Sequence, residues 1–263
     1  MRFTPFSFLT PTAPPITIEY LVVGGGGAGG AANTSDATAF DRAGGGGAGG
    51  FKSGTLSFTS SISYNVIVGA RAPRLAALNQ SGGNGSGSSF GPISVSGGGG
   101  GGYATAGSAG GSGGGGGITN ALSTQAGGAG IADEGFRGTT AFAAGPCPGG
   151  GCVLRPGPGG GAASTGSATS TLWIEGQSKQ WLDGFYYCRG GYVDGMDASV
   201  TGSIRGNGGN GRINSVAGTE GSNGIVKVRY TGSVALFTGG TVEASGGFIY
   251  HTFETGSFTF ASI

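Results

Sequence analysis

The sequence predicts a mainly all-β and irregular fold with almost no α-helix: a bundle, or sandwich, of polyglycine II helices flanked by short β-strands, with a C-terminal β-hairpin region. Glycine supplies 66 of the 263 residues and forms continuous runs. Short stretches rich in β-branched and aromatic residues, which are typical of strands, separate these runs. Hydrophobic residues make up 37% of the chain and the formal net charge is +1, a composition that argues against disorder.

The first strand is expected at residues 16–23, where ITIEYLVV lies between prolines and glycines. The run that follows, GGGGAGG at residues 24–30, returns unchanged at residues 44–50. A repeat interrupted by a short insert predicts one extended rod that leaves and a second that returns, joined by a loop at residues 31–43. At about 3.1 Å per residue, a seven-residue rod spans about 22 Å.

Such rods must be held together through their backbones. A helix with three residues per turn has no internal hydrogen bonds, so its amides need partners on neighbouring rods. Glycine is the residue that lets neighbouring backbones approach closely enough. Collagen is excluded because it requires glycine at every third position and abundant proline, whereas these runs are continuous and poor in proline.

Further strands are expected at residues 56–58, 61–68 and 224–230. The last of these, GIVKVRY, alternates apolar residues with Lys227 and Arg229, which predicts one buried and one wet face.

The long middle of the chain, residues 82–224, is interpreted as rods joined by unlike inserts. The longest glycine runs there are residues 97–102 and 113–117. The one weak helical pattern lies at residues 72–79, inside a second candidate loop at residues 70–81.

The C-terminal region is expected to form a β-hairpin from residues 247–253 and 257–260, joined by the turn residues of ETG. The predicted organisation is therefore a docking segment (residues 1–15), a glycine-rich domain (16–231) and a hairpin module (232–263).

The order of these motifs resembles the glycine-rich proteins of bacteriophage tails. The quoted motifs are LVV followed by GGGGAGG, then SYNVIVG, NGSGSSFG with a run of six glycines, and EGSNGIVKVRY. The closing segment, GGTVEASGGFIYHTFETGSFTF, resembles a β-hairpin found beside this domain in tail proteins, particularly those of cyanobacterial phages. The resemblance implies a virion protein whose closest functional analogue is the polyglycine II adhesin at the tip of a long tail fibre.

That resemblance implies a non-enzymatic tail-fibre protein, made in the host cytoplasm, whose loops recognise a bacterial surface glycan or an outer-membrane protein. The alternative is a structural fibre or baseplate component that binds only other phage proteins. Fibres of this kind are often trimeric, but a tip adhesin can be a single copy. In either case the apolar N-terminal residues are expected to dock onto the fibre: Phe3, Phe6, Phe8 and Leu9.

The strongest candidate for receptor binding is the segment at residues 172–196, which holds both tryptophans and three of the eight tyrosines beside several carboxylates. Aromatic faces next to carboxylates suit sugar rings. The alternative is that these aromatic residues form a packing layer that a glycine bundle otherwise lacks. The candidate residues are Trp173, Glu175, Trp181, Asp183, Tyr186, Tyr187, Tyr192 and Asp194.

Composition argues against several other partners. Charged residues are 10% of the chain and their signs nearly cancel, so we expect no nucleic acid or acidic membrane surface as partner. No run approaches 18 apolar residues, and Pro5 and Pro11 break the first apolar stretch, which predicts neither a spanning helix nor a secretory signal.

Three cysteines and one histidine fall short of a four-ligand zinc site, so no metal is expected. Cys147 and Cys152 flank a flexible PGGG and could form a local disulfide, in which case Cys188 would be unpaired. The alternative is that all three cysteines are reduced.

Enzyme and cofactor patterns are weak. Gly24, Gly26 and Gly29 satisfy G-x-G-x-x-G after a strand, but no helix is expected to follow, so no nucleotide is predicted. His251 stands in an expected strand without a nucleophile motif. Asp194 and Asp197 match no EF-hand spacing.

Overall fold

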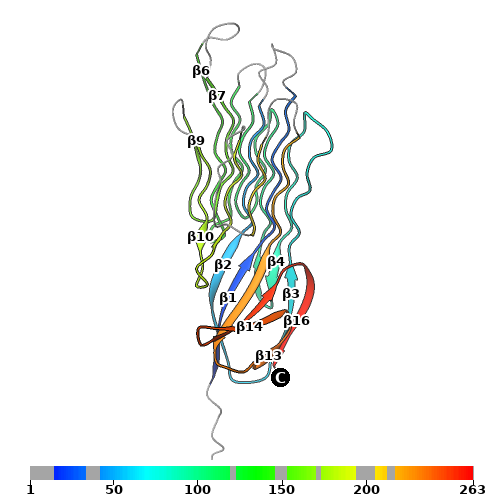
Figure 1. Ribbon diagram of the computed structural model, residues 1–263. Helices are drawn as coiled ribbons and strands as arrows, with labels where there is room; N and C mark the ends of the chain where they lie inside the picture. Colours follow the sequence, from blue (N-terminus) through cyan, green and yellow to red (C-terminus); the bar gives the residue numbers. More distant parts are fainter. Residues whose placement is uncertain are drawn as a thin grey trace, which may run out of the picture.

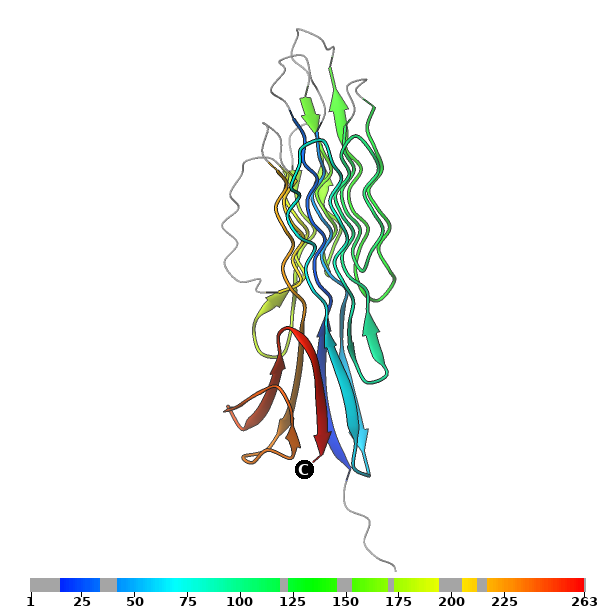
Figure 2. The same cartoon turned by 90° about the vertical axis from the view of Figure 1, so that its right-hand side faces the viewer.

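The computed structural model describes residues 15–33, 42–118, 123–145, 153–169, 173–193, 205–211 and 217–262. The molecule is elongated, with a β-sandwich at one end from which a bundle of extended glycine rods rises (Figures 1 and 2). No helix forms in these ranges, and therefore none long and apolar enough to cross a membrane.

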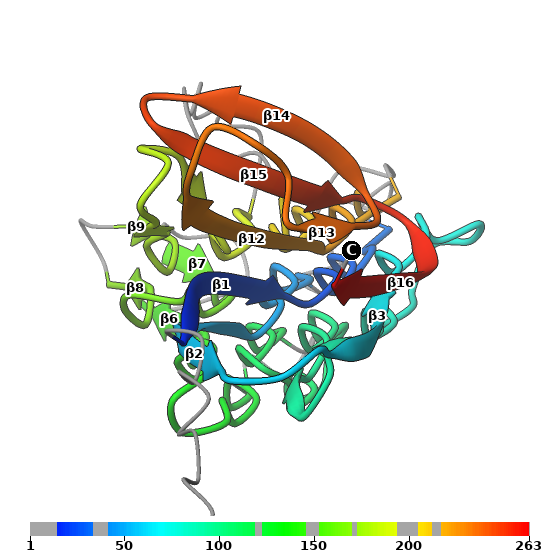
Figure 3. The ribbon, with the colours of Figure 1, turned by 90° about the horizontal axis from the view of Figure 1, so that it is seen from below.

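The sandwich consists of two five-stranded antiparallel sheets, seen from their open end in Figure 3. The first sheet has the order β14 (Thr241–Ser245), β15 (Phe248–Phe253), β12 (Ile225–Thr231), β1 (Ile16–Val23) and β2 (Phe51–Phe58). The second has the order β13 (Phe237–Thr238), β16 (Gly256–Ser262), β3 (Ser63–Val68), β4 (Ser88–Phe90) and β5 (Ile93–Val95).

An aromatic core fills the space between the two sheets. Strand β1 alternates, so that Ile18 and Val22 face this core while Leu21 and Val23 face the opposite side. The fully buried Phe260 lies near the centre of the core, and its ring centroid is 4.6 Å from that of Phe237 in a stacked arrangement. The two sheets are therefore joined by an ordinary apolar core.

In the rods, backbone hydrogen bonds replace that core. In the rod at residues 44–50, hydrogen-bonding direction repeats every third residue, as expected for polyglycine II. Gly44, Gly47 and Gly50 donate N–H bonds of 2.7–2.9 Å to carbonyls of one rod, while Gly46 and Gly49 donate to another. The rod's donors and acceptors reach six neighbouring segments: residues 24–30, 96–102, 112–115, 157–160, 206–209 and Gly191.

The sandwich and the bundle share one register. In the sandwich Val23 lies opposite Phe51, and the next residues continue this pairing, with Gly24 N–H donating to the Gly50 carbonyl at 2.9 Å. Farther along, Gly27 N–H donates to the Gly47 carbonyl at 3.0 Å. The sandwich strands therefore set the alignment of the rods that extend from them.

The rods pack too closely for side chains on their inner sides. A Cβ atom added to Gly115 would overlap the carbonyl oxygen of Gly157, and one added to Gly47 would overlap that of Ser112. Gly83, at the outside of the bundle, would have nothing within 4 Å of an added Cβ. The glycines are thus required by close approach of backbones, not by backbone flexibility.

Three short hairpins interrupt the rods. Two of them, β6 (Phe142–Ala144) with β7 (Val153–Arg155) and β8 (Ser167–Ala168) with β9 (Trp173–Ile174), lie toward the end far from the sandwich (Figure 1). The third, β10 (Lys179–Gln180) with β11 (Tyr186–Tyr187), lies beside the sandwich.

The all-β, helix-poor fold class is confirmed. The expected pairing of residues 247–253 with 257–260 is wrong: β15 pairs with β12 and β14, whereas β16 joins the other sheet. The C-terminal hairpin is instead β14 with β15, joined by two glycines with φ of 59° and 82°, a turn that matches strand twist.

The weak helix at residues 72–79 is also absent, because that segment is irregular. Strands on both sides of residue 231 share the sandwich core. The division of the chain into three parts stays a prediction.

Candidate functional site

The segment proposed for receptor binding does not form one surface. It leaves the far end at β9, runs along the bundle, turns through β10 and β11 beside the sandwich, and returns through residues 188–193 (Figure 1). On the return, Gly191 N–H donates to Gly46 in the bundle interior. The eight candidate residues are consequently spread along the bundle.

Two of the candidates are interior residues. Trp181 is 6% exposed and Tyr187 is fully buried, and both pack with Leu21, Val23 and Ile225 on the outer face of the first sheet. The expectation that these two side chains face a receptor is corrected here: they form the alternative packing layer, because an apolar sheet face needs a cover.

A group of charged side chains fastens the β10–β11 hairpin to this sheet face. Asp183 accepts a hydrogen bond of 2.7 Å from the Tyr187 hydroxyl and one of 2.6 Å from Lys227 Nζ. Only 6% of the Asp183 side chain and 13% of the Lys227 side chain are exposed. Burial, followed by the hydrogen bond and the charge of Asp183, raises the pKa of Tyr187. The Asp183 carboxylate thus fastens the β10–β11 hairpin to the sheet through Lys227.

Arg229 makes a second attachment. Its Nε donates to Glu19 Oε2 at 2.6 Å and its guanidinium also donates to the Leu182 carbonyl at 3.0 Å. The guanidinium lies 4.3 Å from the centroid of the Phe248 ring. Because Leu182 belongs to the hairpin turn, this contact links the hairpin to β1, β12 and β15 at once.

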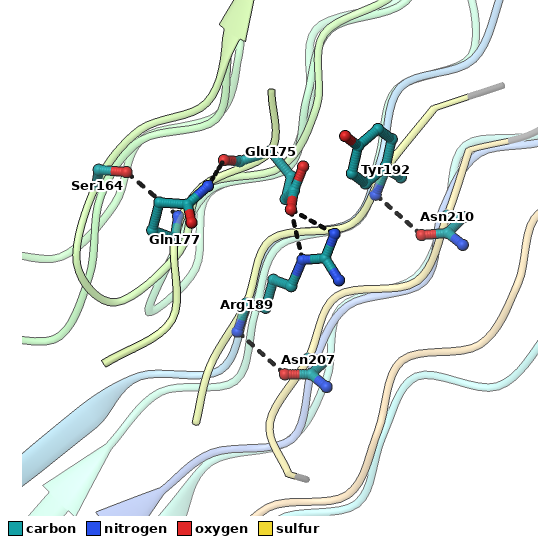
Figure 4. Close-up of polar contacts among 7 residues, drawn as sticks. All are labelled: Ser164, Glu175, Gln177, Arg189, Tyr192, Asn207 and Asn210. Atoms are coloured by element: carbon teal, nitrogen blue, oxygen red, sulfur yellow. Dashed lines mark hydrogen bonds and ion pairs between the residues drawn. The ribbon is translucent and has the colours of Figure 1, made fainter. Parts of the chain in front are cut away.

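Glu175 and Tyr192 meet within the bundle (Figure 4). Arg189 Nε donates to Glu175 Oε1 at 2.6 Å, and both side chains are nearly buried. The Arg189 guanidinium also lies 5.3 Å from the centroid of the Tyr192 ring. The pKa of Tyr192 is raised by burial and then by Glu175. These candidates therefore connect neighbouring rods.

Asparagine side chains extend the rod hydrogen bonding (Figure 4). Asn207 Oδ1 accepts from the Arg189 N–H at 3.0 Å, and three residues later Asn210 Oδ1 accepts from the Tyr192 N–H at 2.9 Å. Sequence reasoning missed this device, although N-x-x-N at the period of the rods is a usable signal. The backbone N–H of Asn207 donates to the Ser222 hydroxyl oxygen and that of Asn210 to the Thr219 hydroxyl oxygen, each at 2.6 Å.

The most exposed large hydrophobic side chains of the candidate segment lie at the turn of the β10–β11 hairpin. Tyr186 is 44% exposed, and it neighbours Leu182 at 53% and Phe185 at 49%. The Trp173 side chain and Asp194 lie outside the described residues. Among the described candidates, Tyr186 is the one with an exposed side chain.

Several other expected residues also fall outside the described ranges. The docking residues Phe3, Phe6, Phe8 and Leu9, the cysteines Cys147 and Cys152, and Asp197 are all in this group. The possible disulfide and the docking role therefore stay predictions.

Cys188 and His251 are both buried. The Cys188 thiol is free and its pKa is raised by burial. His251 Nδ1 lies 2.8 Å from the Gly239 carbonyl and Nε2 lies 3.1 Å from the Tyr230 hydroxyl, and burial lowers its pKa. Because both ring nitrogens are engaged inside the sandwich, His251 has a packing role in this structure. In the described ranges, no cluster of potential metal ligands occurs.

A family model for a glycine-rich domain matches residues 6–231. The chain belongs to this glycine-rich domain family. No curated protein matches it in sequence. The matched region of the glycine-rich domain includes the rods, the β10–β11 hairpin and strands β1 to β12, whereas β13 to β16 follow it and complete both sheets.

Proposed function

We propose that this glycine-rich domain protein is a bacteriophage tail-fibre component that binds a receptor, a glycan or an outer-membrane protein, on a bacterial surface. The observation that supports this proposal is the polarity of the molecule. Strand β1 begins and β16 ends at the sandwich end, while the β6–β7 and β8–β9 hairpins lie at the opposite end of the rods (Figures 1 and 2). One end is thus available for attachment and the other for recognition.

The construction of the bundle suits such a role. Each rod is aligned by backbone hydrogen bonds in several directions, so the connections between rods contribute little to holding it together. Their sequences are free to vary without disturbing the bundle, which is the property a recognition surface needs. A seven-residue rod places its far end about 22 Å beyond the sandwich.

Attachment to other tail proteins is assigned to the segment before β1, through Phe3, Phe6, Phe8 and Leu9. The protein acts on the virion without catalysis. A second candidate, a structural fibre component bound only to phage proteins, is favoured by one observation: the exposed apolar turn at Leu182, Phe185 and Tyr186 lies beside the sandwich and not at the far end. Such a patch suits contact with a neighbouring protein.

Labelling separates the two candidates. Gold-conjugated antibodies against this chain, applied to purified virions of the phage that encodes it, are expected to mark the distal ends of the fibres. Purified protein is also expected to reduce phage adsorption to host cells by competing for the receptor. Labelling surrounded by other tail proteins, without competition, would favour the structural role. Absence of the chain from purified virions would contradict both.

A further inference from the structure

A pocket of about 370 Å³ lies where the β10–β11 hairpin meets strands β1 and β2. Its volume falls at the lower end of the roughly 300–1,000 Å³ that small-ligand sites occupy. The β10–β11 hairpin that borders the pocket lies beside the sandwich, away from the far end of the rods (Figure 1). The lining residues are Glu19, Ser53, Gly54, Thr55, Gln180, Trp181 and Leu182.

The lining offers hydrogen-bonding groups next to apolar surface. Ser53 and Thr55 are exposed and lie two residues apart on β2, so their hydroxyls point to the same side of the sheet. Gln180 contributes a side-chain amide and Glu19 a carboxylate, while Leu182 adds an apolar wall. This combination matches a ring with hydroxyls around its edge and C–H groups on its faces.

Trp181 also borders the pocket. Its indole Nε1 is buried and has no hydrogen-bond partner among the described residues. A ligand in the pocket therefore does not reach Nε1, but contact with the Trp181 ring would change the NMR signal of this N–H.

The charges of the lining restrict the ligand. Glu19 is the one ionised side chain among the lining residues, and none of them is cationic. Arg229, the nearest guanidinium to this carboxylate, is bonded to Glu19 and to the Leu182 carbonyl. An anionic ligand would therefore meet a carboxylate without a free cation to offset it.

We propose that this pocket binds one neutral sugar unit, with hydroxyls bonded to Glu19, Gln180 and the Ser53–Thr55 pair and with a C–H face against Leu182. The site lies apart from the far-end loops of the proposed function. It does not depend on where the protein sits on a virion.

The test uses the full-length purified protein and the indole N–H signal of Trp181 in a ¹H–¹⁵N NMR spectrum, assigned with Trp173→Phe because the chain has two tryptophans. The probes are glucose, galactose and N-acetylglucosamine, with glucuronate as the anionic probe. We expect the Trp181 signal to shift with at least one neutral sugar, with a dissociation constant on the order of millimolar.

The test variant is Thr55→Ile, which removes a hydroxyl and fills part of the pocket. Its matched control is Thr17→Ile, an exposed threonine on the same face of the same sheet but outside the pocket lining. We expect binding to weaken about tenfold or more in Thr55→Ile and to be unchanged in Thr17→Ile.

Three results would overturn the proposal. These are the absence of any Trp181 shift with the neutral sugars at about 50 mM, far above the expected dissociation constant, an equal effect of the two threonine variants, and binding of glucuronate as tight as that of glucose. Each is read on folded protein in solution, so it is distinct from a failure of the virion labelling.

Discussion

The two ends of the molecule are built from the same chain segments by different means. In the sandwich, each strand forms backbone hydrogen bonds with a neighbour on either side in the plane of the sheet. Its side chains alternate between the two faces of the sheet, and one face must be covered by an apolar core. In the bundle, a three-residue period turns successive amides in three directions, and the rod at residues 44–50 bonds to six neighbours. In the bundle, backbone hydrogen bonds therefore make the interior contacts that apolar side chains make in the sandwich.

The transition between the two is direct. Rod residues 24–30 continue β1, residues 44–50 lead into β2, and residues 217–224 lead into β12. Gly26 N–H donates to the Ser222 carbonyl at 2.9 Å, which continues the pairing of Val23 with Ile225. A run of glycine has no side chains to fix its own register, so the sandwich supplies it. The alignment of the rods in the bundle therefore depends on the register of the sandwich strands that they continue.

The largest effect is expected from adding a side chain inside the bundle. Gly115→Val would push a side chain into the backbone of the neighbouring rod at Gly157. We expect the free energy of unfolding to fall by more than about 5 kcal/mol, or the variant to fail to fold. Chemical denaturation measures this.

The control is Gly83→Ala in the same bundle. Its Cβ would point into open space, and the extended conformation of a rod is allowed for alanine. Stability is expected to stay within about 1 kcal/mol of the parent. Equal tolerance of Gly115→Val and Gly83→Ala would argue against close packing of the rods.

A smaller loss is expected where the hairpin is fastened to the sandwich. Asp183→Ala would leave the nearly buried Lys227 ammonium without its carboxylate, at an expected loss of about 3 kcal/mol. The double variant Asp183→Ala with Lys227→Met removes the stranded charge and should recover much of that loss. If Asp183→Ala were as stable as the parent, the hairpin would not depend on this ion pair.

The smallest effect concerns pH and belongs to the sandwich alone, since His251 is the only histidine. Its pKa is lowered in the folded state, so below an unfolded pKa of about 6.5 the unfolded chain binds a proton that the folded chain does not. Stability should therefore be full above about pH 6.5 and fall as the pH is lowered through the window beneath it, by at most about 1.4 kcal/mol per pH unit.

Urea unfolding of the parent and of His251→Gln across this pH window measures the contribution. The variant should show a flatter dependence on pH. An identical slope in both proteins would show that His251 titrates alike in the folded and unfolded states.

Local sequence patterns were sufficient for some elements. The apolar run ITIEYLVV predicted β1, the alternation around Lys227 predicted β12, and the glycine repeat predicted a pair of opposed rods. Strand β2 begins earlier than expected, because FKSG looks irregular in sequence. At Gly54 a Cβ atom would lie 2.7 Å from the Tyr20 hydroxyl oxygen, so the Tyr20 side chain would have to shift to admit it.

The candidate site was less predictable, because it depends on tertiary pairing. Nothing local to Trp181 or Tyr187 tells whether these aromatics face solvent or cover the outer face of β1 and β12. Likewise, the turn after β15 cannot tell which sheet β16 will join. The exposed side chain of Tyr186 beside a buried Tyr187 follows simply from strand alternation once the sheet face is known.

The central claim, that hydrogen bonding in three directions holds the bundle together, is tested most directly by amide hydrogen exchange at residues 24–30. Each of these seven consecutive N–H groups donates to a backbone carbonyl, at 2.9–3.1 Å. All seven should therefore be protected to a degree similar to the paired amides of β1. Exchange at the rate of an unstructured glycine linker, or protection only at alternate residues, would contradict it.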